Sequence, residues 1–428
     1  MLLTKNRFKS VLIAVIIVSL FFSLTNYTNS SQNIDNLAYV MAIGIDVGKI
    51  SKYTISVQIS TIDPSNGQKS GSSKESSKKE EPSKESNSSS NYIINTIDCD
   101  SIDSAISIID SYIDKKINLS YCKVLVLSEE VAKQGVSAIV NSLISKVEIR
   151  PDCNIVVSRV PQNEFEDDSS SPTIGDTLSK YYESISSTTV GDGYNQVEKL
   201  SDFYYKLHDF FYEPSASLGS IVNSQESNSS TNPDSSSKQE ASNVKNDAEN
   251  FLIETNGLAV FKDDKLVGYL TDVESICHLL TTNKLNNSTI SINSPFSNDE
   301  EVDLYLSTLK DTKAKVRIIN GSPYIVVDYD VSVRILSFNS NTSIFSSDMI
   351  SKIEESAKKY LTDKIYNYLN KTSKELSADV AGFGKDAAIN FRTLNDWNNY
   401  NWLKNYKNST FKVNVKMSIK PGYVLMEE

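Results

Sequence analysis

The chain has 428 residues, of which 39% are hydrophobic and 23% are charged, and its formal net charge is −11. This length predicts about two to four domains, with enough apolar residues to build hydrophobic cores. The acidic balance argues against nucleic acid as the main partner, because phosphate binding needs a basic face.

The N-terminus has the pattern of an export signal. Lys5, Arg7 and Lys9 precede an apolar run from Val11 to Leu24. The run is shorter than the roughly 20 residues of a typical transmembrane helix, but the residues after it lack a clear A-x-A cleavage site. We therefore expect residues 1–27 to form an uncleaved signal anchor, with the basic flank in the cytoplasm and the rest of the chain outside.

Residues 34–165 are predicted to form a small α/β domain. Residues 64–91 are nearly all Ser, Lys, Glu, Gly and Asn, so we expect a disordered insertion within this domain. Helical spacing of apolar residues predicts helices at 102–113 and Glu129–Leu143. Apolar or alternating stretches predict strands at Ala38–Asp46, Tyr53–Ile59, Tyr92–Ile97, Tyr121–Leu127 and Cys153–Val160.

Residues 173–293 are predicted to form a middle domain. A second polar segment, 223–247, is expected to be a disordered insertion in it. Before the insertion, amphipathic patterns predict two helices, and after it two apolar segments around a charged turn predict a β-hairpin followed by a helix and a strand. These elements are Ile174–Ile185, Val197–Tyr212, Leu258–Phe261 with Leu266–Leu270, a helix from about Asp272, and Thr289–Ile292.

Residues 300–428 are predicted to form a C-terminal α+β domain. An apolar stripe from Ile350 to Leu369 indicates a long helix. The strands are expected at Val302–Leu309, Lys315–Ile319, Tyr324–Leu336 and Phe411–Ile419. The sequence therefore predicts a mixed α/β or α+β chain, with an N-terminal membrane anchor followed by three small mixed-sheet domains with flanking helices.

No complete set of catalytic or metal-binding residues is visible in the sequence. His208 and His278 are the only histidines, which are too few for a zinc site, and no nucleophile accompanies them in a recognisable pattern. The cysteines form no CxxC pair, so we expect them to be buried apolar residues, while a disulfide among them stays open. We expect no enzyme activity and no cofactor. The four cysteines are Cys99, Cys122, Cys153 and Cys277.

Two glycine-containing segments match phosphate-binding loops only in part. The segment Gly44–Gly48 lacks the GxGxxG spacing. The segment Gly382–Lys385 ends like a P-loop, but Asp379 stands where the first glycine belongs, and Asp386 replaces the Ser or Thr. We expect these glycines to permit tight turns or close packing.

Three motifs, in order and at their spacing, resemble those of the Ger(x)C family, the C subunits of spore germinant receptors. The first is the segment Ile34–Asp46, the second is the hairpin Gly257–Leu270, and the third is Ala378–Gly384. A tryptophan pair precedes the last alternating strand, as in that family. The residues that carry the resemblance are Gly44, Asp46, Gly257, Phe261, Gly268, Asp379, Gly382, Gly384, Trp397 and Trp402.

The resemblance implies an extracytoplasmic subunit at the inner membrane of a spore. It also implies two integral membrane partners, an A-type subunit with a large soluble part and a B-type subunit that resembles an amino-acid transporter, in a receptor that triggers germination when nutrients bind. Family members are typically lipoproteins, but this chain has no cysteine before Cys99. Our hypothesis is that the apolar N-terminal segment replaces the lipid.

Asp396, Trp397 and Trp402 are candidate residues for docking a partner subunit, because Trp is favoured at interface hot spots. Packing of the two indole rings in a core is the alternative. Two other functions stay open at this point. One is a stand-alone extracytoplasmic solute- or wall-binding protein, and the other is a spore cortex hydrolase, since carboxylates are abundant enough for a glycosidase pair.

Overall fold

The structure is a computed structural model that describes residues 36–60, 92–159, 193–194, 196–223, 251–296, 300–338 and 347–420, together with Val15, Ile16 and Ser19. The rest of the predicted anchor, the predicted helix Ile174–Ile185 and the two predicted insertions, apart from Asn223, lie outside these residues. Within the described part of the chain, no helix has the length and apolar character needed to cross a membrane.

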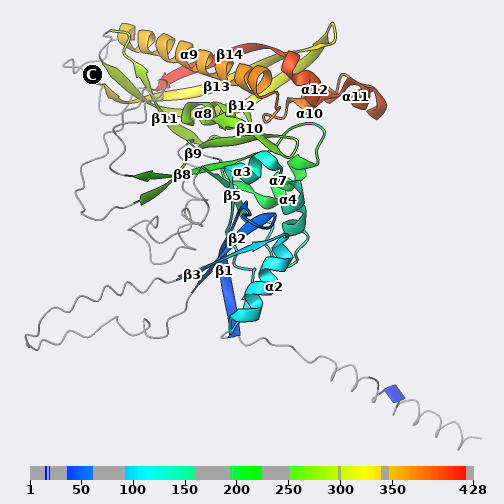
Figure 1. Cartoon of the computed structure of the whole chain (residues 1–428). Helices are drawn as coiled ribbons and strands as arrows, with labels where there is room; N and C mark the ends of the chain where they lie inside the picture. Colours follow the sequence, from blue (N-terminus) through cyan, green and yellow to red (C-terminus); the bar gives the residue numbers. More distant parts are fainter. Residues whose placement is uncertain are drawn as a thin grey trace, which may run out of the picture.

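The described strands form two sheets, whereas the sequence predicts three mixed-sheet domains (Figure 1). The first sheet has ten strands, with the order β10-β9-β8-β6-β5-β1-β2-β3, and β4 and β7 pair with β1 and β6. Its strands are β1 (Leu37–Val47), β2 (Tyr53–Ser60), β3 (Tyr92–Cys99), β4 (Lys116–Asn118), β5 (Val124–Ser128), β6 (Asn154–Ser158), β7 (Glu198–Lys199), β8 (Ser215–Asn223), β9 (Phe251–Lys262) and β10 (Lys265–Leu270).

The second sheet has the strand order β11-β12-β13-β14. The strands predicted for a middle domain are thus divided, because β9 and β10 join the first sheet and β11 joins the second. The physical reason is the pairing of β8, which lies parallel to β6 and antiparallel to β9 and so extends the first sheet. The strands of the second sheet are β11 (Asn287–Asn293), β12 (Glu301–Ile319), β13 (Ser322–Phe338) and β14 (Thr410–Lys420).

The strand β1 lies inside the first sheet, between β2 and β5. Val40, Ile43 and Ile45 belong to the main hydrophobic core of this sheet, which we call the first core. Met41 and Ala42 belong to a small cluster of their own. Successive side chains of a strand point to opposite faces, so a strand buried on both faces has a nearly continuous apolar sequence. β1 is a strand of this kind, and the predicted strand Ala38–Asp46 is confirmed.

Helices cover both sheets (Figure 1). The long helix α9 lies along the second sheet and contacts β14, and its predicted apolar stripe is buried at Ile353, Ala357, Leu361, Ile365 and Leu369. This stripe and the inward side chains of the second sheet form what we call the second core. The helices up to the end of α9 are α2 (Ile102–Tyr112), α3 (Glu129–Gln134), α4 (Ser137–Ile144), α7 (Leu200–Leu207), α8 (Asp272–Thr281) and α9 (Ser347–Asn370) in the described part of the chain.

Four predicted elements differ in the structure. The single helix predicted for Glu129–Leu143 is two helices, because the chain breaks at Gly135, whose φ is 129°. The helix predicted for Val197–Tyr212 is shortened to α7, because β7 precedes it. The two strands predicted at Val302–Leu309 and Lys315–Ile319 are one long strand, β12, whose pairing with β13 shifts register between them.

The two cores meet at β9. Leu258 and Val260 belong to the second core, whereas Ala259 and Phe261 belong to the first. This assignment follows the alternation of a strand, in which neighbouring side chains point to opposite faces. The other strand of the predicted hairpin, β10, likewise places Leu266 in the first core and Leu270 in the second, so both cores share the hairpin.

Candidate functional site: the junction between the two cores

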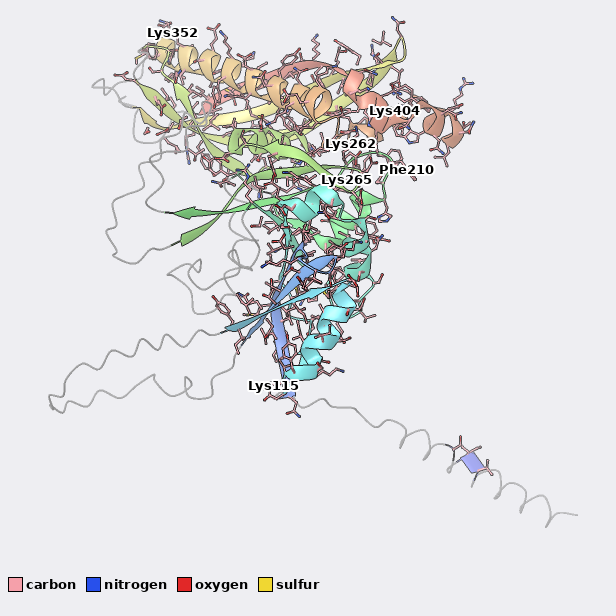
Figure 2. The ribbon with its side chains drawn as sticks, in the orientation of Figure 1. Lys115, Phe210, Lys262, Lys265, Lys352 and Lys404 are labelled. Atoms are coloured by element: carbon pink, nitrogen blue, oxygen red, sulfur yellow. The ribbon has the colours of Figure 1, made fainter. Side chains whose placement is uncertain are left out.

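Three segments meet where the cores come together, and we call this region the junction. They are the hairpin β9–β10, the segment Asp209–Pro214 after α7, and the loop Asp379–Gly384. Backbone hydrogen bonds join them: the amide of Phe261 donates to the carbonyl of Pro214 over 3.0 Å, and the amide of Glu213 donates to the carbonyl of Asp379 over 2.9 Å. In Figure 2, the labelled Phe210 and Lys262 lie in this region.

Asp379 is buried at the centre of the third motif. Its Oδ1 accepts hydrogen bonds from the amides of Gly382, over 2.9 Å, and Phe383, over 3.2 Å. Its Oδ2 accepts from the amide of Gly384, over 2.9 Å, and from Nε1 of Trp402, over 2.8 Å. These are amides that a P-loop would present to phosphate. The carboxylate of the chain itself occupies them, so this segment is not built as a phosphate site.

The same hydrogen bonds favour the charged form of Asp379, yet burial outweighs them. Burial raises the pKa of this carboxyl to about 6, while the bonds from Trp402 and the three amides act in the opposite direction. The loop is the start of α10 (Phe383–Ala388), and a carboxylate at a helix N-terminus also interacts favourably with the helix dipole. Asp379 therefore holds the loop in shape.

The glycines of the second and third motifs allow backbones to approach closely. A Cβ at Gly384 would lie 2.1 Å from the carbonyl oxygen of Phe211, which belongs to the segment after α7. A Cβ at Gly257 would lie 2.4 Å from the carbonyl oxygen of Leu270, on the opposite strand of the hairpin. Gly268 packs on the side chain of Leu376. The requirement for glycine predicted from the motifs has this structural basis.

The tryptophan pair lies inside the second core. Trp397 and Trp402 are 4% and 1% exposed, and their rings stack with centroids 6.1 Å apart. The ring of Phe211 lies 5.3 Å from that of Trp397, so the pair also contacts the junction. The two indole rings therefore pack in a core, which is the alternative that the sequence left open. Asp396 is exposed on α11 (Leu394–Tyr400), next to α12 (Trp402–Asn405), and docking of a partner over these residues stays a prediction.

The first motif does not reach the junction. Gly44 and Asp46 lie in β1, which β5, β6 and β8 separate from β9 in the sheet. Gly44 is paired with Ser56 and with Val126 on the two neighbouring strands. The carboxylate of Asp46 accepts a hydrogen bond from the next amide in the chain, over 2.7 Å. The contacts of these two residues therefore lie within the first sheet.

Glu213 is a junction residue that the sequence did not indicate. Its Oε2 accepts a hydrogen bond of 2.8 Å from the amide of Asp263, in the hairpin turn. Burial raises its pKa to about 7, and the neighbouring carboxyls of Asp263 and Asp379 act in the same direction, while Lys262 opposes them. Within the described residues, Oε1 has no hydrogen-bond partner. It follows the predicted helix Val197–Tyr212 and precedes Pro214, and nothing in this local sequence indicates burial, so only the fold reveals its position.

A second set of buried polar side chains joins the elements of both sheets. Nδ1 of His278, on α8, lies 2.8 Å from the hydroxyl of Tyr368, on α9, and Nε2 lies 2.9 Å from Oε1 of Gln196. Gln196 also donates to Glu198, whose buried carboxylate pairs with Lys206. Burial holds the pKa of His278 well below its usual range. Both ring nitrogens are engaged, so this histidine serves packing.

The other candidates for chemistry do not form a site. His208 is exposed, and its Nδ1 lies 3.0 Å from the carbonyl of Tyr204 in its own helix. Lys385, the P-loop-like lysine, lies over the ring of Tyr212, with Nζ 4.5 Å from the centroid. Across the described ranges, no three His, Cys, Asp or Glu side chains gather as a metal site would require.

Comparisons with known proteins divide the chain into two parts that meet at the junction. A model described as "Spore germination protein N-terminal domain" matches residues 30–221. A model described as "Spore germination B3/GerAC like, C-terminal" matches residues 256–421. The junction joins these two parts, because Glu213 belongs to the first and the hairpin and Asp379 belong to the second.

Among solved structures, the crystal structure of the GerBC protein is similar, with 14% sequence identity and a TM-score of 0.49 over 88% of this chain and 96% of that chain. No curated protein matches the sequence. The two family models follow each other along most of the chain, in the order that the motifs predict. The chain belongs to the Ger(x)C family of GerAC-like spore germination proteins.

Proposed function

We propose that the chain is the extracytoplasmic C subunit of a nutrient germinant receptor and that it is needed for triggering spore germination. In this proposal the N-terminus anchors the chain in the spore inner membrane, and the described domains lie on the extracytoplasmic side. The partners are two integral membrane subunits, of the A and B types. The role is binding and assembly, without catalysis. The match of both family models, in order, supports the proposal.

The observation that carries the assembly role is the junction itself. The amide of Glu213 donates to the carbonyl of Asp379, and Phe261 is bonded to Pro214, so the two family-matched parts share backbone hydrogen bonds. Both cores also bury side chains of β9. An interface with a buried core and satisfied hydrogen bonds fixes two parts in one orientation. A subunit built in this way presents surfaces from both parts to its partners as one body.

The buried polar side chains at the junction and around His278 support a role without catalysis. Asp379 is bonded by three amides and an indole, and His278 is engaged at both ring nitrogens. General acid–base catalysis needs a group within reach of a substrate proton. Both groups are buried and already hold other parts of the protein.

Deletion and complementation test the proposal. Spores that lack the chain are expected to lose their response to one class of nutrient, and full-length protein restores it. A matched pair of complementing variants separates the junction from the surface: Gly384→Ala is expected to fail, whereas Lys359→Ala, at an exposed position of α9 in the same part, is expected to restore the response. A normal nutrient response in deletion spores, across the nutrients to which the parent strain responds, would contradict a receptor role.

A further inference from the structure

Two of the four cysteines are in contact. The sulfur atoms of Cys122 and Cys153 lie 3.8 Å apart, and both side chains are buried in the first core. Cys122 precedes β5, and Cys153 directly precedes β6. The other two lie elsewhere, Cys99 at the end of β3 and Cys277 within α8. All four are free thiols in this structure.

The backbone already holds the two residues at a suitable separation. β5 and β6 are parallel neighbours, with Val124 paired to Asn154. The amide of Asn154 donates to the carbonyl of Lys123 over 2.8 Å, so the ladder reaches the residues beside both cysteines. Adjacent strands lie about 4.8 Å apart, and a disulfide joins Cα atoms about 4.4–6.8 Å apart. The register places Cys153 beside Lys123, one residue from Cys122, and the two sulfurs already lie 3.8 Å apart, so a small adjustment brings them to the S–S distance of about 2.05 Å.

We propose that Cys122 and Cys153 form an intramolecular disulfide in the mature protein. The proposal rests on the extracytoplasmic location given under the proposed function, since disulfides persist in oxidising compartments. Each thiol loses its proton, one bond forms between the two sulfurs, and two electrons pass to the disulfide of a thiol–disulfide oxidoreductase, which becomes a dithiol.

The bond forms while the chain folds. In the folded protein each cysteine is 2% exposed, which closes both thiols to an enzyme. The contact with Cys122, together with burial, also holds the pKa of Cys153 well above its usual range. The thiolate is the reactive form, so the folded thiols react slowly. Oxidation before the first core has formed avoids both the burial of the thiols and the raised pKa of Cys153.

The crosslink stabilises the part of the first domain that supports the hairpin turn. It closes a loop that contains β5, α3 and α4. Between the two helices, the amide of Val136 donates to the carbonyl of Asp264 over 2.9 Å, and the amide of Ser137 lies 3.4 Å from the carboxylate of Asp264. Asp264 belongs to the turn of the β9–β10 hairpin, so the loop closed by the disulfide braces one side of the junction.

Peptide mapping of the full-length protein from spore membranes tests the bond. Free thiols are blocked with N-ethylmaleimide at lysis in denaturant, and trypsin digestion follows without reductant. The expected product is one crosslinked pair, residues 117–123 joined to residues 147–159, while Cys99 and Cys277 carry the label. Label on both Cys122 and Cys153 would overturn the proposal. That result would leave co-purification with membrane subunits, and hence the proposed function, untouched.

Thermal melts give a second readout on protein refolded in a glutathione redox buffer. Reductant is expected to lower the melting temperature of wild type and of Cys99→Ser by several degrees, because a native disulfide restricts the unfolded chain. Cys122→Ser is expected to melt at one temperature with and without reductant. An equal response to reductant in Cys122→Ser and Cys99→Ser would overturn the proposal.

Discussion

Nε1 of Trp402 donates a hydrogen bond of 2.8 Å to Oδ2 of Asp379, and both residues are buried. The two residues are 23 positions apart in the chain, and the same carboxylate binds the amides at the start of α10. The bond therefore ties α12 to the loop that Glu213 contacts. It also explains why a motif that resembles a P-loop in part carries an aspartate.

Trp402→Phe is expected to destabilise the protein because it removes a donor from a buried carboxylate. The loss of a hydrogen bond to a buried charged group costs about 1–3 kcal/mol of unfolding free energy. Denaturant unfolding followed by circular dichroism measures it. The control is Asp396→Ala, an exposed change that is expected to stay within about 0.5 kcal/mol of wild type. Equal stability of the two variants would contradict the buried bond.

Alanine at two motif glycines is expected to give unequal effects. At Gly384 the new Cβ would meet the backbone carbonyl of Phe211 at 2.1 Å, and a backbone atom cannot move aside without breaking the junction. At Gly268 the Cβ would meet the end of the Leu376 side chain at 2.5 Å, which can rotate away. Melting temperatures should fall much more for Gly384→Ala. The reverse order would show that the junction is loosely packed.

Glu213 is expected to make stability depend on pH. Its pKa is about 7 in the folded protein, against an ordinary value of 4.5, so the folded state keeps a proton that the unfolded chain releases. The stabilisation is complete below about pH 4.5 and is lost as the pH rises through 7. Asp379 acts in the same direction up to about pH 6.

Glu213→Gln tests this dependence, because the amide oxygen can still accept from Asp263 but the side chain does not titrate. Denaturant unfolding between pH 6 and 8 is the measurement. Wild type is expected to lose stability across this range, and the variant is expected to lose clearly less. Identical slopes for the two proteins would assign the pH dependence to other groups.

The buried ion pair of Glu198 and Lys206 is expected to matter more than an exposed pair. The carboxylate side chain of Glu198 is 0% exposed, and Lys284 lies 3.7 Å from it as well. Glu198→Ala leaves the ammonium of Lys206 without its buried partner, which costs about 3–5 kcal/mol. The exposed pair Asp348–Lys352 is the control, and Asp348→Ala should cost less than about 1 kcal/mol. Urea unfolding compares them.

The spacing of apolar residues along the sequence was enough to predict several elements. The apolar strand β1, the hairpin with its charged turn, and the striped helix α9 follow from the spacing of apolar residues. The family-like motifs also indicated Asp379 and its glycines. An acidic side chain a few residues before a Gly-x-Gly segment is a signal for the bonds that the structure shows.

The pairing of distant segments could not be predicted in the same way. Nothing in the sequence of β8 shows that it pairs with β6, and this pairing brings β8, β9 and β10 of the predicted middle domain into the first sheet, while β11 joins the second. Gln196 and His278 are 82 residues apart, and each looks like an ordinary polar residue until the fold brings them together. Glu213 is a similar case, because its burial depends on a turn 50 residues away.

Co-purification tests the central claim most directly. Full-length protein with a C-terminal tag is purified from detergent-solubilised spore membranes, and its partners are identified by mass spectrometry. The account predicts two multi-spanning membrane proteins, one with a large soluble part and one resembling an amino-acid transporter, retained by wild type and lost with Gly384→Ala. Recovery of the wild-type chain alone from membranes that contain both of these proteins would contradict it.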